Sequence, residues 1–560
     1  MKKTNILALS LAASLSLQAA QPHVPNIGDA LQQVKPPKIK QEKKELPKVE
    51  MQKEKPLKEF YDSKKIAIKN ITVDRVVHVD YEDIREIVSA YENRDLSFAD
   101  IQEIASKITK LYRANGYFVA RAYIPEQNIL KENNNLKFSI IEGEYGEFEL
   151  RNHSLVKDSI LQANLDNIKS KNIISTNTLE RAMLIINDTP GATVTKAEVK
   201  PGKEVGSSDF IIGTDATSRY GGYILADNYG SQYTGRHRLI AGADINSPFK
   251  IGDKLSILGL TSESAGLLNA RLSYDFPLYE NGLRANISYA KTTYELGNKY
   301  KDLDAVGTSD SITLKLTYPL IKSRLQKLDL YLDSSYNKMK DEIQANSVNI
   351  KKDSLVATLG ADFTKDYIIF GANFQTRADV SYTIGNLEFE NKVDEVQDKA
   401  GADINGVFSK VNVELGQDFE LGQKTRWENS LQMQYALSGK NLDGSQDLSI
   451  GGIYGVRYYP DGEESAENGF IFNTELFYEL PSFVSLNSKV SVFYDIGRVY
   501  ATKNFTGDYA RTLQDVGLGY TGSYKTLYLN THLAKNLSNN MQSEEKKFDL
   551  KFLFQAGWIF

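Results

Sequence analysis

Two segments in the last quarter of the chain carry residues that could form a charged pair. Residues 455–460, Gly-Val-Arg-Tyr-Tyr-Pro, place Arg457 in a long loop between two predicted strands. Residues 493–497, Phe-Tyr-Asp-Ile-Gly, lie in a strand with apolar side chains at alternate positions, so Asp495 belongs to its polar face. A guanidinium and a carboxylate in a confined channel make a charge-assisted, directional pair. From these residues alone, however, Arg457 is more simply explained as an exposed loop side chain.

Other patterns that could carry chemistry are weak. Residues 517–522 fit G-x-G-x-x-G, but they lie in a strand and turn region without a helix to hold a phosphate, so we expect these glycines to fit close to neighbouring side chains. The histidines are scattered without metal-ligand spacing, and the absence of cysteine excludes disulfides and thiolate metal sites. Glu463, Glu464 and Glu467 are expected to form an exposed loop cluster. We therefore predict no enzyme activity, no catalytic residue, no cofactor and no metal.

The composition favours strands and more than one domain. The chain has 560 residues, with Tyr 32 and Phe 24 against Trp 2 and Met 6. The formal net charge of -5 argues against general nucleic-acid binding. Residues 1–20 have the order of a secretory signal peptide: Lys2 and Lys3, then an apolar core, then small residues.

The C-terminal end predicts a membrane barrel. Phe552, Phe554, Ala556, Trp558 and Phe560 share one face of a terminal strand. This row would be an aggregation hazard in water, but it suits the lipid-facing side of a closing barrel strand. Alternating segments of about ten residues, separated by turn residues, begin near Tyr220. We predict an all-β transmembrane barrel of about 16 antiparallel strands over residues 217–560, with its charged face lining a wet lumen. Trp558 and Phe560 are the predicted membrane-insertion signal.

The region before the barrel divides into four parts. Residues 21–35 could form a short helix with Ile27, Leu31 and Val34 on one side, which must dock because it is marginal alone. Residues 36–65 are rich in Lys, Glu and Pro and are interpreted as a linker. Residues 66–145 and 146–216 look like two copies of one α+β unit, each ordered strand, two helices, strand, strand. The predicted elements are an opening strand at 66–71, helices at 101–112 and 179–186, and strands at 121–124, 136–141, 193–199 and 209–214.

Several motifs in a fixed order resemble those of one family. They are Leu-Tyr-Arg-Ala-Asn-Gly-Tyr at 111–117, Ala-Arg-Ala-Tyr-Ile-Pro-Glu-Gln at 120–127, Ile-Ile-Glu-Gly at 140–143, Ile-Asn-Asp-Thr-Pro-Gly at 186–191, Lys-Pro-Gly at 200–202, Asp-Asn-Tyr-Gly at 227–230 and Thr-Gly-Arg at 234–236. Together they resemble the outer-membrane transporters of two-partner secretion (TpsB type), which include haemolysin secretion/activation proteins and filamentous haemagglutinin transporters. The resemblance covers nearly the whole chain and implies two periplasmic POTRA domains before the barrel.

The resemblance also implies roles for the two segments described first. Residues 455–460 match the family's Val-Arg-Gly-Phe/Tyr motif, at the tip of a sixth extracellular loop that folds into the lumen. Residues 493–497 match its Phe-x-Asp-x-Gly motif on a barrel strand. Arg457 and Asp495 are then the expected loop–lumen pair, with Val456, Tyr458, Tyr459, Phe493 and Gly497 as supporting residues. Tyr458 stands where the family usually has Gly, which leaves the conformation of the tip open.

The function implied by the resemblance is export of an unfolded partner exoprotein to the surface of a Gram-negative bacterium, without nucleotide hydrolysis. The partner, of haemolysin, adhesin or contact-dependent toxin type, would present an N-terminal secretion domain to a POTRA sheet edge at Val194, Thr195, Ala197 and Val199. The helix at 21–35 would plug the lumen together with the sixth loop. Other expected partners are outer-membrane lipid and the barrel assembly machinery; no nucleic acid is expected.

Two further classes of function stay open. One is an outer-membrane assembly protein or insertase of the same superfamily, and the other is a passive porin. Two POTRA units and the Pro-Glu-Gln motif argue against the first, and the presence of residues 66–216 argues against the second.

Overall fold

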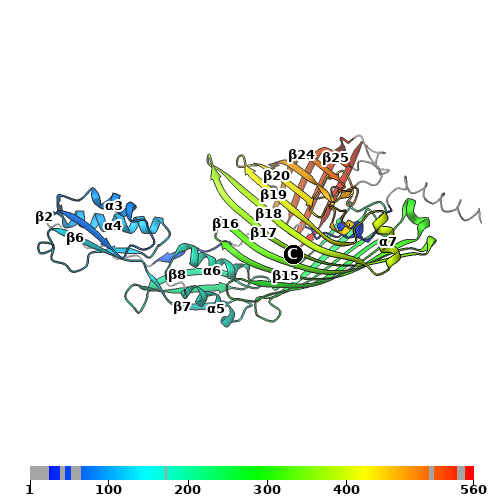
Figure 1. Ribbon diagram of the computed structural model, residues 1–560. Helices are drawn as coiled ribbons and strands as arrows, with labels where there is room; N and C mark the ends of the chain where they lie inside the picture. Colours follow the sequence, from blue (N-terminus) through cyan, green and yellow to red (C-terminus); the bar gives the residue numbers. More distant parts are fainter. Residues whose placement is uncertain (1–23, 38–44, 52–64, 171–172, 504–509, 539–548) are drawn as a thin grey trace, which may run out of the picture.

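A computed structural model of the chain describes residues 24–37, 45–51, 65–170, 173–503, 510–538 and 549–560. The predicted signal peptide at 1–20 and parts of the predicted linker lie outside these residues. The molecule is elongated: the first α+β unit lies farthest from the barrel, and the second lies between it and the barrel (Figure 1).

The first unit packs two helices on small sheets. Helix α4 begins with a capping box, in which the Ser97 side chain accepts from the N–H of Asp100 and the Asp100 carboxylate accepts from the N–H of Ser97. The predicted opening strand at 66–71 is wrong as a single strand, because Lys69 interrupts it and the halves pair with different partners, β4 and β6. The elements are β2 Lys65–Ile68, β3 Asn70–Asp74, α3 Tyr81–Ser89, β4 Arg94–Ser97, α4 Phe98–Ala114, β5 Arg121–Tyr123 and β6 Asn135–Ile141.

The second unit has a four-stranded sheet in the order β1-β8-β9-β7. Helices α5 and α6 cover it, and the apolar stripe predicted around Met183 is buried in its core. The elements are β7 Glu144–His153, α5 Asp158–Lys169, α6 Thr176–Asp188, β8 Thr193–Pro201 and β9 Ser207–Asp215.

The first strand of this sheet comes from the predicted linker. Strand β1 (Val49–Met51) pairs in parallel with β8, with Val49 opposite Ala197 and Met51 opposite Val199. Leu46 is 7% exposed and packs in the core of the second unit. The expectation that residues 36–65 form only a solvated spacer is therefore wrong for residues 46–51. Burial of two aliphatic side chains and pairing with a free sheet edge offset the conformational entropy that this short segment loses when it is ordered.

Sixteen antiparallel strands close the barrel, which confirms the predicted fold class. The barrel closes where β27 pairs with β10, from Tyr223 opposite Ile559 to Asp227 opposite Gln555. Its strands are β10 Tyr220–Asp227, β11 Arg238–Asn246, β12 Lys254–Ser262, β13 Leu267–Pro277, β14 Arg284–Glu295, β15 Ala305–Lys322, β16 Gln326–Ile343, β17 Val348–Ile369, β18 Ala372–Phe389, β19 Gly406–Glu420, β20 Thr425–Ala436, β23 Asn468–Glu479, β24 Leu486–Tyr500, β25 Ala510–Tyr524, β26 Leu527–Asn536 and β27 Leu550–Ile559.

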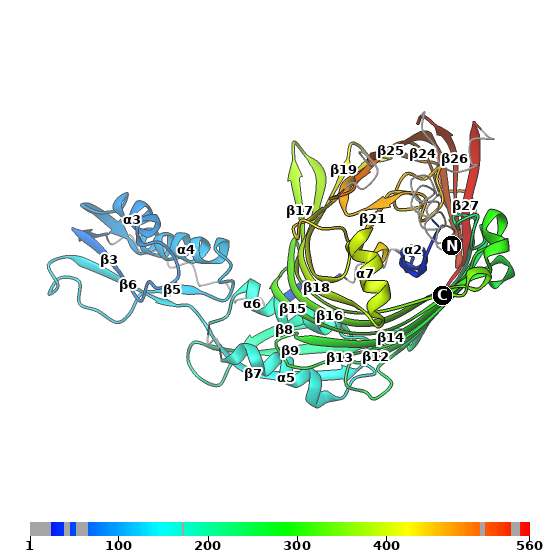
Figure 2. The same cartoon turned by 45° about the vertical axis from the view of Figure 1, so that its right-hand side comes forward.

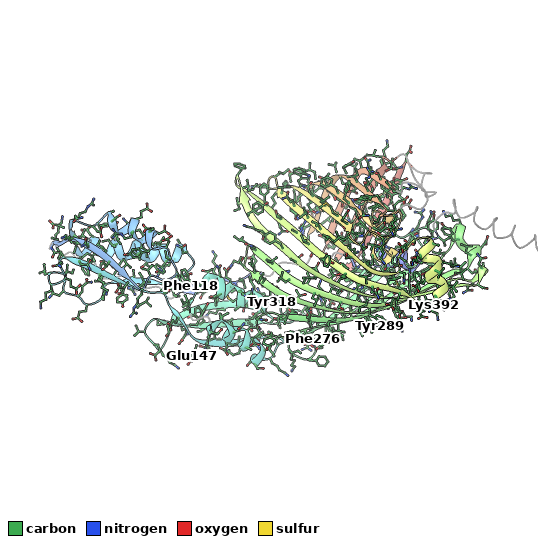
Figure 3. All side chains as sticks on the ribbon, viewed as in Figure 1. Phe118, Glu147, Phe276, Tyr289, Tyr318 and Lys392 are labelled. Atoms are coloured by element: carbon green, nitrogen blue, oxygen red, sulfur yellow. The ribbon has the colours of Figure 1, made fainter. Side chains whose placement is uncertain are left out.

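The barrel wall presents apolar side chains outward. In β27, Phe552 and Trp558 are 59% and 54% exposed, whereas Leu553 and Gln555 of the other parity are buried. Tyr289 of β14 belongs to the same outer surface and is 46% exposed (Figure 3). Tyr318 of β15 lies at the end of the wall near the second unit, where the Arg181 guanidinium approaches its ring at 5.9 Å.

Two helices are associated with the barrel and with its loops. Helix α2 (Ile27–Gln32) lies inside the ring of strands, and α7 (Lys392–Ala400) follows β18 in the loop before β19 (Figure 2). The loop between β20 and β23, residues 437–467, contains η5 Gly444–Gln446, β21 Leu448–Ser449 and β22 Ser465–Ala466. The described residues also contain the 3-10 turns η2 Glu263–Ala265, η3 Asn298–Leu303 and η4 Gln344–Asn346. Among the described residues, we find no helix with the length and apolar character needed to cross a membrane.

Candidate functional site in the barrel lumen

The sixth loop, residues 437–467, turns inward and packs against the lumenal wall. Its hairpin β21–β22 pairs Leu448 with Ala466, and an apolar cluster of loop and wall side chains lies beyond it. From the loop this cluster contains Ile450, Val456, Tyr458 and Tyr459, all fully buried. Burying a side chain of this size is worth about 1.5–3 kcal/mol, so apolar packing contributes strongly to holding the loop inside.

The structure brings Arg457 and Asp495 together within this cluster. Arg457 donates from Nε to Asp495 Oδ2 at 2.8 Å and from Nη2 to Oδ1 at 3.0 Å. The Asp495 side chain is completely buried and that of Arg457 is 7% exposed. The guanidinium also lies 3.9 Å from the ring centroid of Phe493. This is a two-pronged ion pair stacked on an aromatic face, a geometry that lysine could not reproduce.

Three more polar residues on neighbouring strands complete what we call the Arg457 centre. Arg457 Nη1 donates to Glu475 Oε2 of β23 at 2.6 Å and lies 3.2 Å from His532 Nε2 of β26. Asp515 of β25 lies directly opposite Asp495 and accepts from the backbone N–H of Tyr458 at 2.5 Å. No motif in the sequence marks these three residues as site residues. The available signal was that their side chains lie at the alternate strand positions that face the lumen. This alternation does not reveal which positions of different strands lie opposite one another.

Tyr458 fits at the loop tip with an ordinary backbone conformation: its φ is not positive, so the left-handed region is not used. Its ring packs edge-on against Tyr459 with centroids 5.1 Å apart. Lys551 of β27 donates to the Tyr458 carbonyl at 3.1 Å, and its ammonium lies 5.1 Å from the ring. The tip therefore holds a large aromatic side chain at the position where the resemblance described above implies glycine.

Glycines on the wall make room for these side chains. A Cβ at Gly497 would lie 2.9 Å from Ile450 and 3.2 Å from Val456, both in the loop. A Cβ at Gly517 would collide with the Phe493 ring. The motif at 517–522 thus lies in β25, and its first glycine accommodates a neighbouring side chain as expected.

The acidic residues of the loop are less exposed than predicted. Glu464 and Glu467 are only 4% and 6% exposed, so the expectation of an exposed cluster is wrong for both. The reason is that the loop folds into the lumen, where Glu467 accepts from the backbone N–H of Thr502 at 3.0 Å. In the part of the chain that the structure describes, no group of three or more potential metal-binding side chains occurs.

Helix α2 fills space beside the sixth loop. Asn26 and Asp29 form a capping box at its start, which explains a helix of only six residues. Ile27 is fully buried, and its backbone N–H donates to Asp341 of β16 at 2.7 Å. Gln32 donates from Nε2 to the carbonyls of η5 and its neighbour, at 3.1 Å to Gly444, 3.3 Å to Ser445 and 3.2 Å to Asp447. The helix and the loop therefore obstruct the lumen together.

The sheet edge predicted to bind the partner is occupied in this structure. Val194, Thr195, Ala197 and Val199 lie in β8, which has β9 on one side and β1 on the other, although β1 covers only residues 197–199. On the same strand, a hydrogen bond from Lys196 lowers the pKa of the Glu198 carboxyl. A partner strand added at residues 197–199 would have to replace β1.

The predicted insertion signal lies at the closure of the barrel. Trp558 lies opposite Ile224 of β10, and Phe560 exchanges two backbone hydrogen bonds with Gly222, at 2.9 and 2.8 Å. The Phe560 ring, 62% exposed, covers Gly222, where a Cβ would lie 3.0 Å from it.

Two α+β units on a closed barrel, with a lumen obstructed by an inward loop, define an outer-membrane translocation pore. The family is shown by the match to haemolysin secretion/activation protein ShlB/FhaC/HecB over residues 206–522, and by that to the ShlB-type POTRA domain over residues 66–143. The chain belongs to this family, as predicted, and is a two-partner secretion transporter of the outer membrane with its POTRA domains in the periplasm. For brevity the two units are called POTRA 1 and POTRA 2 below; the POTRA match covers the first.

Known relatives agree with this assignment. The heme/hemopexin transporter protein HuxB of Haemophilus influenzae (strain 86-028NP) is 30% identical over 475 residues, covering 83% of this chain and 82% of HuxB. The outer membrane transporter CdiB of Dickeya dadantii is 21% identical over 397 residues, covering 70% and 68%. The solved structure of CdiB from Escherichia coli has the same fold, with a TM-score of 0.72 at 17% identity, covering 99% of this chain and 98% of that one.

Proposed function

We propose that this transporter exports one or a few large partner exoproteins through its own barrel, and that the sixth loop and α2 must leave the lumen for export. The observation that carries the proposal is the Arg457 centre, a buried ion pair between the obstructing loop and the wall. A bond that holds an obstruction inside a channel has a role in a gated pore but none in an open one. Partner folding outside the cell would drive transport, with no catalytic step in this chain.

Recognition of the partner begins at POTRA 2 in this proposal. An unfolded segment of the N-terminal secretion domain replaces β1 and pairs with β8 along Val194, Thr195, Ala197 and Val199. Because β1 is only three residues long, a longer partner strand would make more backbone hydrogen bonds at this edge.

The names of the relatives support a choice of cargo class. Since HuxB carries the name heme/hemopexin transporter protein and is 30% identical, an exoprotein connected with heme or hemopexin is the first cargo to test. Haemolysin-type and contact-dependent toxin-type exoproteins are the alternatives.

Assembly of the transporter needs two further partners in this proposal. The barrel assembly machinery recognises the terminal strand with Trp558 and Phe560, and outer-membrane lipid covers the exposed aromatic face once β27 has paired with β10.

The test is a comparison of secreted and surface proteins in cells that carry the wild-type chain, a deletion of its gene, or Arg457→Ala. Arg377→Ala is the matched control, because Arg377 makes a two-pronged pair with Asp418 within the wall. We expect one large protein to disappear in the deletion and in Arg457→Ala but not in the control. Depletion of many barrels would support an assembly factor instead, and a change only in small-solute uptake would support a porin.

A further inference from the structure

A second buried arginine joins the two elements that obstruct the lumen. Arg238 of β11 is 5% exposed and holds Asp227 of β10 with two prongs, Nε to Oδ1 at 2.8 Å and Nη2 to Oδ2 at 3.2 Å. Its remaining arm, Nη1, donates to Asp461 Oδ2 of the sixth loop at 2.5 Å and to the backbone carbonyl of Gln33 at 3.1 Å. Gln33 is the residue that caps the end of α2. We call these residues the Arg238 centre.

The surrounding contacts bring the helix end and the loop to the same place. Thr234 Oγ1, in the loop between β10 and β11, donates to Gln33 Oε1 at 2.8 Å. The backbone N–H of Asp461 donates to the Tyr229 carbonyl at 3.0 Å. A Cβ at Gly462 would lie 3.5 Å from the Gln33 side chain. The cavity between helix, loop and wall at this point measures only about 30 Å³, room for about one water molecule.

Shared use of one nitrogen makes the two contacts interdependent. If the loop leaves, Nη1 loses its carboxylate acceptor and this side of the buried arm is opened to water, which weakens its bond to the Gln33 carbonyl. If the helix leaves, one side of the buried arm is opened to water, which weakens its pair with Asp461. Lysine could keep the charge, but a single ammonium on a flexible stem does not span three acceptors in fixed directions.

We propose that Arg238 is a positioning residue that couples release of α2 to release of the sixth loop, so that the two obstructions leave the lumen together. This inference rests on the proposed function, in which both elements leave during export. It adds that neither clears the channel alone, and that the coupling lies at a wall residue outside the Arg457 centre.

The absence of cysteine from the chain permits a direct test with single cysteines. Ala30→Cys introduces what we call the helix probe and Ser449→Cys the loop probe, at residues that are only 2% and 7% exposed. Labelling of intact cells with a membrane-impermeant maleimide measures how often each probe becomes accessible. The perturbing change is Asp461→Asn, which removes the charge and keeps the shape. Asp418→Asn, which perturbs the wall pair with Arg377, is the matched control.

We expect Asp461→Asn to raise the labelling rate of both probes together by about tenfold, the effect of losing one charged hydrogen bond, while the control leaves both unchanged. By linkage, deletion of residues 24–35 should also raise labelling of the loop probe. Because this deletion removes the bonds from Gln32 to the loop as well, Arg238→Lys is the variant that serves if Asp461→Asn fails to assemble. Arg238→Lys should raise both rates and remove the further effect of Asp461→Asn.

A rise at the loop probe with no rise at the helix probe, or no change at either, would overturn the coupling. Heat-modifiable gel mobility verifies that each barrel is closed. Because labelling needs no partner protein, the coupling can fail while the secretion test of Arg457→Ala succeeds, and the reverse.

Discussion

The two lumenal arginines hold the sixth loop in opposite ways. Arg457 belongs to the loop, and all its charged partners belong to wall strands, Asp495 on β24 and Glu475 on β23. Arg238 belongs to the wall and reaches both the loop and the end of α2. The first arrangement decides whether the loop lies against the wall. The second allows the loop and the helix to behave as one obstruction.

The largest expected effect is a loss of secretion when a wall carboxylate is removed, and the size of this loss should differ between the two centres. Asp495→Ala leaves the buried Arg457 guanidinium hydrogen-bonded to one carboxylate, that of Glu475, and removing one partner of a buried pair costs about 3–5 kcal/mol. We expect secretion of the partner per assembled barrel to fall by more than about tenfold, because a loop without its docking pair has no defined position in the channel that the partner must cross. Asp227→Ala should lower secretion less, because the lost pair joins two wall strands and Arg238 keeps its bonds to the loop at Asp461 and to the helix end at Gln33. Immunoblots of medium and outer membrane measure both, and equal losses would remove the distinction between the centres.

A second change removes α2 and leaves the Arg457 centre intact. Deleting residues 21–34 removes α2 with its buried side chains Ile27 and Ala30, while the Arg457 centre keeps every contact described above. We expect a severalfold rise in pore conductance in planar bilayers, because a barrel of 16 strands encloses an aqueous channel when it is not obstructed. Deletion of α7, residues 392–400, is the control. Unchanged conductance would mean that α2 does not limit the pore.

A third change tests the other end of the N-terminal segment. Arg324, between β15 and β16, donates to the carbonyls of Leu46 and Pro47 at 3.3 and 3.2 Å, so an arginine of the barrel holds this segment at each end. Leu46→Ala in the POTRA 2 core should cost about 2–5 kcal/mol locally and loosen β1. We expect tighter binding of the partner's secretion domain to the purified transporter, measured by titration. Glu50→Ala, at an exposed position of β1, should have no effect, and equal affinities in both variants would contradict a competing strand.

The sequence predicted one of these two centres and not the other, for a physical reason. Period-two alternation assigns Asp495 to the lumen, and the loop motif supplies Arg457. The partners Glu475 and His532 depend on how neighbouring strands are staggered around the barrel, which no local pattern encodes. Arg238 is a polar residue at the start of a strand. Its partners Gln33 and Asp461 lie 205 and 223 positions away, and no local pattern near Arg238 predicts that they are in contact with it. Strand β1 was not predicted, because three residues in a Lys- and Pro-rich segment form a strand only when they pair with the edge of β8.

The smallest expected effect concerns POTRA 1, which contributes to neither centre. Glu92 accepts from the backbone N–H of Ile71 and from Arg85, both at 3.0 Å, and these contacts, the backbone one first, lower the pKa of its carboxyl. A carboxyl with a lowered folded pKa stabilises the fold above its unfolded pKa, and this stabilisation is lost as the pH falls through the folded pKa. Lowering the pH should therefore cost POTRA 1 at most about 1 kcal/mol through this carboxyl, which lies near the surface. The cost is measured as a lower protection factor of the Ile71 amide in the full chain, after correction for the intrinsic pH dependence of amide exchange.

Glu92→Gln should abolish most of that pH dependence, whereas Glu86→Gln, at an exposed position of α3, should preserve it. Over the same pH range, labelling of the helix probe and the loop probe should respond equally in the wild-type background and in Glu92→Gln, because the carboxyl lies in the unit farthest from the barrel (Figure 1). A response of either probe that depends on Glu92 would mean that POTRA 1 is energetically linked to the lumen. The separation of the two arginine centres from the distal periplasmic unit would then be wrong.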